Sequence, residues 1–150
     1  MILQTRVDKF LKEVDKEKLK NAKALFCGFK GDSLKEIKRI GLPQFSNISF
    51  ASKLRMFLDP QNYVTLDLKL LKIKESRIHT FFDDVAKYST CIPINSENCR
   101  QYALWSQKCK ETASTYFRDM EIIAVDVERG VWKLIDKDRL EEAAGIVANM

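Results

Sequence analysis

The sequence predicts an all-α protein, and three observations support that prediction. Apolar residues recur at helical spacing in several stretches, only five Gly and three Pro occur among 150 residues, and one short stretch alone looks extended. The 45% hydrophobic and 31% charged content provides enough apolar area for a folded core, which excludes a disordered or collagen-like chain. We expect a single helical domain over residues 1–150.

Five stretches place apolar residues on one face of a helix. In chain order, these stripes are Leu3, Val7, Phe10, Leu11 and Val14; Phe50, Leu54, Phe57 and Leu58; Ile78, Phe81, Phe82, Val85 and Ala86; Tyr102, Trp105, Cys109, Ala113 and Tyr116; and Val127, Val131, Leu134 and Ile135. The spacing therefore predicts a helix at each of these five places.

Start and stop signals agree with the stripes. Ser33-Leu34-Lys35-Glu36 has the form of a capping box, and Asp59-Pro60 ends the helix that begins near Ile48. Asn95-Ser96 and Asp126 are candidate caps for two later helices. Tyr63-Val64-Thr65-Leu66 is expected to be extended, with Asp67 opening the next helix.

Composition also bounds the location and the cofactors. No run of eighteen apolar residues occurs and charges fall within the first ten positions, so we expect no membrane span, no signal peptide and a cytoplasmic protein. The four cysteines form no CxxC pair, so we expect reduced thiols, mostly in the core, and no metal or other cofactor. Residues 1–80 have a net charge of +8 and residues 81–150 a net charge of −3. This asymmetry indicates a side that faces a polyanion or, alternatively, ordinary solubility charge.

Residues 34–58 have the order of a helical hairpin, with a short helix, the turn Ile40-Gly41-Leu42-Pro43 and a second helix from Ile48. The first N–H groups of a helix have no partner within the helix and lie at the positive end of its dipole. They can therefore bind a nucleic-acid phosphate, a contact that positions a protein without reading the base sequence.

This segment resembles the helix-hairpin-helix DNA glycosylase superfamily, whose pattern is a Leu-Pro-Gly-x-Gly hairpin, a helix, and an Asp in an extended-to-helix turn. The hairpin entry is similar to residues 40–43, the following helix to Ala51-Ser52-Lys53-Leu54, and the approach to the catalytic Asp to residues 57–67. Residues 124–132 are similar to the closing helix of uncharacterised bacterial proteins with this fold. The resemblance covers roughly residues 34–73 and 95–135. It implies a glycosylase-like fold, duplex DNA as partner, and Asp67, in the turn 63–73, as the catalytic residue.

The chain departs from the family pattern at two points. The hairpin glycines fall on Phe45 and Asn47 in a register fixed by residues 51–53, or on Gln44 and Ser46 in a register fixed by Pro43. The lysine that forms a Schiff base in bifunctional members falls on Ser49 or on Ile48 in these two registers. Asp67 follows Ser49 by 18 residues, a spacing that favours the first register. The resemblance then implies hydrolysis without a Schiff base, unless Lys53 substitutes.

The hairpin and its neighbours supply the expected contacts to DNA, which are Gln44, Phe45, Ser46, Asn47, Ser49, Lys53 and Lys69. Seven basic residues cluster around this region in the sequence: Lys35, Lys38, Arg39, Lys53, Arg55, Lys69 and Lys72. A glycosylase flips its target base into a pocket, where aromatic side chains stack on it. The candidates for that role are Tyr63, Tyr102, Trp105, Tyr116 and Trp132, although Trp105 and Tyr116 also fit a helix face in the core.

A carboxylate such as Asp67 can stabilise the oxocarbenium-like transition state of N-glycosidic cleavage. An Asp between an extended stretch and a helix is also a good N-cap, a role worth about 1 kcal/mol, and one side chain can serve both roles. We therefore keep two hypotheses. The first is a duplex-DNA-binding protein that hydrolyses the bond to a damaged base through Asp67. The second is a non-enzymatic helix-hairpin-helix module that binds DNA or another protein.

Overall fold

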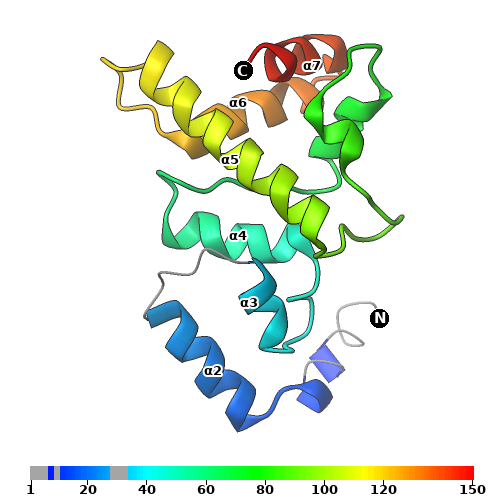
Figure 1. Ribbon diagram of the computed structural model, residues 1–150, viewed down its shortest axis with the longest axis vertical. Helices are drawn as coiled ribbons and strands as arrows, with labels where there is room; N and C mark the ends of the chain where they lie inside the picture. Colours follow the sequence, from blue (N-terminus) through cyan, green and yellow to red (C-terminus); the bar gives the residue numbers. More distant parts are fainter. Residues whose placement is uncertain (1–6, 9–10, 28–33) are drawn as a thin grey trace.

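The computed structural model describes residues 7–8, 11–27 and 34–150, and this part of the chain is mostly helical with no strand (Figure 1). The elements are α2 (Lys16–Cys27), α3 (Leu34–Arg39), α4 (Ile48–Leu58), the 3-10 helices η1 (Leu70–Glu75) and η2 (Phe81–Asp84), α5 (Ser96–Tyr116), α6 (Ala124–Asp136) and α7 (Leu140–Asn149). The predicted all-α class is confirmed. None of the described helices is both long and apolar enough to cross a lipid bilayer.

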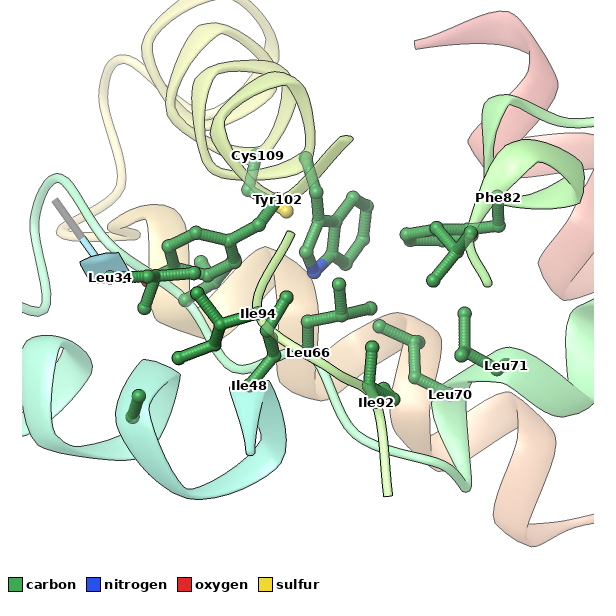
Figure 2. Packing of buried hydrophobic residues seen from close by; sticks show 14 of the residues in the cluster. Leu34, Ile48, Leu66, Leu70, Leu71, Phe82, Ile92, Ile94, Tyr102 and Cys109 are labelled. Atoms are coloured by element: carbon green, nitrogen blue, oxygen red, sulfur yellow. The ribbon is translucent and has the colours of Figure 1, made fainter. Parts of the chain in front are cut away.

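The long helix α5 crosses the middle of the molecule, with α4, α3 and α2 on one side and α6 and α7 on the other (Figure 1). One apolar cluster extends from Ala22 of α2 to Val147 of α7. Its centre is formed by α5, by the extended chain before η1 and by the chain before α5, and Figure 2 shows Tyr102, Leu66 and Ile94 meeting there. Residues distant in the sequence therefore share one core.

Helix α5 confirms the predicted stripe and its cap. The Asn95 side chain accepts the N–H of Asn98 at 2.7 Å, as expected of an N-cap. The stripe residues Tyr102, Trp105, Cys109 and Ala113 are buried. Only Tyr116, at the end of the helix, is exposed.

Helix α4 ends before Asp59-Pro60 as predicted, but its fully buried positions are not the predicted ones. The side chains of Phe57 and Leu58 are exposed, and the buried positions are Ile48, Ala51, Ser52 and Arg55. These positions follow the same helical spacing on a different face. Phe50 and Leu54 of the predicted stripe are partly buried against the core. The predicted stripe is therefore only half right, because the burial of Ser52 and Arg55 cannot be seen in an apolar pattern.

The helix predicted over Ile78 to Ala86 is wrong, since only the single 3-10 turn η2 forms there. The Thr80 hydroxyl accepts the N–H of Phe82, and the Asp83 carboxylate accepts the N–H of Thr80, so the turn is capped at its start. At its end, Asn98 binds both the N–H and the carbonyl of Ala86. These side chains take up the backbone groups that a longer helix would pair internally.

Some sequence predictions fall partly or wholly outside the described residues, among them Leu3, Phe10 and the Ser33 cap. Helices α2 and α7 lie in stretches for which no helix was predicted. All four cysteines are free, and Cys109 alone is buried, so the expectation that most of them lie in the core is wrong. Cys91 and Cys99 are half-buried, and Cys27 is exposed.

The buried Asn98 amide should be a major contributor to stability, because it makes three hydrogen bonds, at 2.8 to 2.9 Å, to Ala86 and to the carbonyl of Pro93. Asn98→Ala leaves those backbone groups without partners and is expected to lower the free energy of unfolding by about 3 kcal/mol. Urea denaturation measures this. Gln107→Ala, which truncates an exposed amide on the same helix, should change it by no more than about 0.5 kcal/mol. Equal effects of the two substitutions would contradict the role given to Asn98.

Candidate active site

The extended chain before η1 is held between α4 and α5 by hydrogen bonds to its backbone. The Ser52 hydroxyl of α4 accepts the N–H of Leu66 at 3.1 Å, and the Trp105 indole of α5 donates to the carbonyl of Thr65 at 3.0 Å. A buried segment outside regular structure needs such partners, since an unpaired buried backbone group is costly. The two bonds place the next residue, Asp67, beside α4.

Asp67 has two roles in this geometry. Its Oδ1 accepts the N–H of Leu70 at 2.9 Å and so caps η1, which confirms the predicted cap, although the helix that follows is 3-10 rather than α. Its Oδ2 lies 3.9 Å from Nζ of Lys53 on α4, and the side chain is only 20% exposed. One carboxylate oxygen is thus structural, and the other faces a cation.

Helix α6 supplies the opposite wall. The N–H of Val125 donates to the carbonyl of Pro60 at 3.3 Å, which fixes the start of α6 next to the end of α4. Glu128, Trp132 and Asp136 follow at intervals of four and therefore lie on one face of α6. Lys69 pairs with Asp136, and its ammonium lies 3.9 Å from the centre of the Trp132 ring.

These elements line an open cavity of about 230 Å³ at the surface. Its lining residues are Lys53, Thr65, Asp67, Glu128, Arg129 and Trp132. Pockets for drug-sized ligands occupy about 300–1,000 Å³, so this one suits a smaller group such as one flat ring system. It combines two carboxylates, two cations and an aromatic side chain.

Glu128 is the most perturbed group in the cavity. The residue is only 6% exposed, and its carboxylate makes no ion pair or hydrogen bond with the described part of the chain. Burial, with a further contribution from the negative charge of Asp67, raises the pKa of Glu128 to about 7, while Arg129 and Lys53 act in the opposite direction. A substantial fraction of Glu128 therefore carries its proton at neutral pH.

A protonated carboxyl group beside a second carboxylate is the arrangement used in acid and base catalysis. Glu128 can donate a proton to a leaving group, while Asp67 can stabilise developing positive charge. Trp132 offers a flat apolar surface at the same cavity. No cluster of three or more His, Cys, Asp or Glu side chains that could hold a metal ion occurs within residues 7–8, 11–27 and 34–150.

The hairpin itself differs from the sequence expectation. The N–H of Ile48 donates to the carbonyl of Ile92 at 2.9 Å, and the Asn47 side chain accepts the N–H groups of Ser49 and Ile92. The expectation that the first N–H groups of this helix are unpaired is therefore wrong. The chain at 92–94 covers them, because Asn47 and Pro93 form an isolated antiparallel bridge.

The other expected DNA contacts are separated. Phe45 is buried, with its ring 6.2 Å from that of Phe26 and 5.6 Å from that of Phe50, so it belongs to the core. Gln44 and Ser46 are exposed on the hairpin. The Ser49 hydroxyl is buried without a hydrogen-bond partner.

Only Lys53, Asp67 and Lys69 of the predicted site residues come together, on the α6 side of α4. Among the candidate aromatics, Trp132 lines the same cavity. Trp105 and Tyr102 are core residues, and Tyr116 is exposed at the far end of α5.

The functional residue that the sequence analysis does not single out is Glu128. A signal for it was present in the spacing. The buried positions of α6 include Ala124, Glu128, Val131 and Ile135, so an acidic residue occupies a place in the apolar stripe. An acid at such a position is a candidate for a perturbed pKa.

Comparison with known proteins adds no relative: no family model matches the chain, and neither the curated proteins nor the solved structures provide a match. The site is therefore interpreted from its own geometry.

Glu128 should make stability depend on pH. Because the folded chain holds this proton more tightly, the free energy of unfolding falls as pH rises from the ordinary carboxyl pKa of 4.5 to about 7. Each pKa unit corresponds to about 1.4 kcal/mol, so the loss attributable to Glu128 is about 3 kcal/mol.

Glu128→Gln removes this titration and is expected to gain stability relative to the unsubstituted protein between pH 4 and pH 8. Urea denaturation at a series of pH values measures the difference. Glu121→Gln, at an exposed position, is the matched control and should follow the unsubstituted protein. If the free energy of unfolding of Glu128→Gln differed from that of the unsubstituted protein by the same amount at every pH, the site would not raise the pKa of Glu128.

Proposed function

We propose that this chain binds duplex DNA and hydrolyses the N-glycosidic bond of a damaged base in the cavity between Asp67 and Glu128. The observation that carries the proposal is that a buried carboxyl with a pKa of about 7 shares this cavity with a carboxylate that faces Lys53. Two carboxyl groups in different protonation states match the two roles that glycosidic hydrolysis requires.

In the proposed reaction, Trp132 stacks on the flipped base. Glu128 donates its proton to a nitrogen of the base as the C1′–N bond breaks, and Asp67 stabilises the positive charge that develops on the sugar. A water molecule then attacks C1′ and gives a proton to Glu128. The products are the free base and an abasic sugar, and Glu128 is again protonated for the next turnover.

The hairpin backbone supports the resemblance to the helix-hairpin-helix glycosylases at one position. Gln44 has a φ of +67°, in the left-handed region that glycine favours. In the register fixed by Pro43, a family glycine falls on Gln44, so this backbone favours that register over the one based on Ser49. The Schiff-base position is then Ile48, a buried residue without nucleophilic chemistry, which agrees with hydrolysis.

Because the N–H groups at the start of α4 are paired, phosphate contacts are assigned to side chains. Lys53 and Arg129 both line the cavity and are 48% and 64% exposed, and a phosphate at the rim would share them with their carboxylate partners Asp67 and Asp126. Each phosphate that such a cation neutralises should add about 0.9 to the slope of log K against log salt.

Asp67→Asn is the variant that tests catalysis, because Asn retains the oxygen that caps η1 and removes the negative charge. We expect it to bind duplex DNA with unchanged affinity and to release base at least about a hundredfold more slowly. The measurement is base release from duplexes carrying uracil, oxidised or alkylated bases, or a mismatch. Asp83→Asn is the matched control, since Asp83 caps η2 away from the cavity.

Three outcomes would contradict the proposal in different ways. Undetectable or salt-insensitive duplex binding would remove DNA as the partner. Salt-sensitive binding without release of any base would favour the non-enzymatic DNA-binding module. Base release that is trapped by borohydride and lost in Lys53→Gln would replace hydrolysis by Schiff-base chemistry, for which the position of Lys53 near Asp67 provides a specific reason.

A further inference from the structure

A second cavity, on another face of α4, contains a buried cation without a counterion. Arg55 is 4% exposed, its Nε has no hydrogen-bond partner, and no carboxylate forms an ion pair with it within the described part of the chain. Its guanidinium lies 3.7 Å from the ring centre of Tyr63 and 5.5 Å from that of Tyr102. Arg55 is two positions from Lys53, about 200° around the helix, so the two side chains point to different sides.

The groups around Arg55 also include hydrogen-bond donors. The hydroxyls of Tyr102 and Ser106 are buried, and neither makes a hydrogen bond of good geometry, although they lie close enough for the Ser106 hydroxyl to lower the pKa of Tyr102. Burial raises the pKa of Tyr102, which keeps its phenol protonated and able to donate. Together with Arg55 and Lys110, they line a cavity of about 470 Å³ that also contains Asp59 and Asn62.

Cations outnumber carboxylates in the lining of this region. A third cavity, of about 300 Å³, adjoins the cavity at Arg55. The two share Arg55 and Tyr102, and Lys35 and Arg100 also line the third cavity. Neither nearby carboxylate forms an ion pair with Arg55, because Asn62 donates to both oxygens of Asp59, and Glu97 pairs with Arg100. The charge of Arg55 is therefore left for another partner.

A buried charge without a partner is unfavourable, and a planar guanidinium matches the oxygens of a phosphoryl group through two parallel hydrogen bonds. The Tyr63 ring lies against one face of the guanidinium, so an anion that binds Arg55 would do so at its N–H edge. Arg55, Lys110 and the two hydroxyls provide more donors than the two oxygens of a carboxylate require, whereas a phosphoryl group has three terminal oxygens. The larger cavity lies within the range of about 300–1,000 Å³ that holds a whole small molecule.

We propose that the cavity at Arg55 binds the phosphoryl group of a small phosphorylated molecule, held by the Arg55 guanidinium and the hydroxyls of Tyr102 and Ser106. This site does not depend on the proposed glycosylase activity, because it shares no lining residue with the Asp67 cavity. A phosphate of a nucleic-acid backbone has the same chemistry, and the experiment separates the two sources.

Inorganic phosphate is the probe, added at constant ionic strength with chloride as the balancing anion. Isothermal titration should detect saturable binding to the unsubstituted protein, and the melting temperature should rise with phosphate concentration. Arg55→Met should abolish both effects while leaving the protein folded, since an apolar side chain replaces an unpaired buried charge. Tyr102→Phe and Ser106→Ala should each weaken phosphate binding about tenfold.

Lys72→Met is the matched control, because it removes an exposed cation elsewhere and should leave phosphate binding unchanged. The hydroxyl variants keep the test decisive if Arg55→Met fails to fold, since they retain the guanidinium. The proposal would be overturned if phosphate did not bind the unsubstituted protein saturably. It would also be overturned if Tyr102→Phe and Ser106→Ala bound phosphate as tightly as the unsubstituted protein. If a short duplex displaces phosphate and its own affinity falls equally in the hydroxyl variants, the nucleic-acid backbone is the source and the small-molecule assignment is wrong.

Discussion

The structure depends on how the extended chain from Tyr63 to Asp67 is held between α4 and α5. Its central residues are buried, so its backbone groups must find partners inside the protein. The Ser52 hydroxyl of α4 and the Trp105 indole of α5 supply them. Because a residue in extended chain advances by about 3.3 Å, these bonds also fix where each end of the segment lies.

Each end of that segment contributes to one of the two cavities. At its start, Tyr63 covers the guanidinium of Arg55. At its end, Asp67 faces Lys53 and shares a cavity with Glu128. Lys53 and Arg55 come from the same helix but from different sides of it, so a single short segment and a single helix position both sites.

The parts of the fold that could be predicted from the sequence are those in which local pattern and tertiary burial agree. The stripe of α5 is buried apart from Tyr116, that of α6 is buried or partly buried, and the Asp67 cap depends only on a neighbour three residues away. The prediction failed for η2, where Asn98, distant in sequence, takes the backbone groups of Ala86. It also failed for the hairpin, since the bridge to Pro93 spans more than forty residues and leaves no local pattern.

The same distinction applies to the candidate site. Asp67 could be found from its turn, whereas Glu128 required knowing that α6 packs beside the end of α4. Burial changes the chemistry of an ordinary acidic residue, and burial is a tertiary property that charge patterning along one helix does not reveal.

The distribution of charge shows why the basic half of the chain does not form one surface. Lys53 and Lys69 lie toward α6, and each has a carboxylate partner, in Asp67 and in Asp136. Arg55 lies toward α5. Burial raises the pKa of the half-buried Cys99 thiol there, and the positive charges of Lys35, Arg55 and Lys38 offset part of that increase. Cations on one side of α4 are therefore neutralised within the protein, and the charge of Arg55 on the other side is not. Since an uncompensated charge attracts an anion more strongly than a paired one does, Arg55 is better placed than Lys53 to attract an anion, away from the catalytic cavity proposed here.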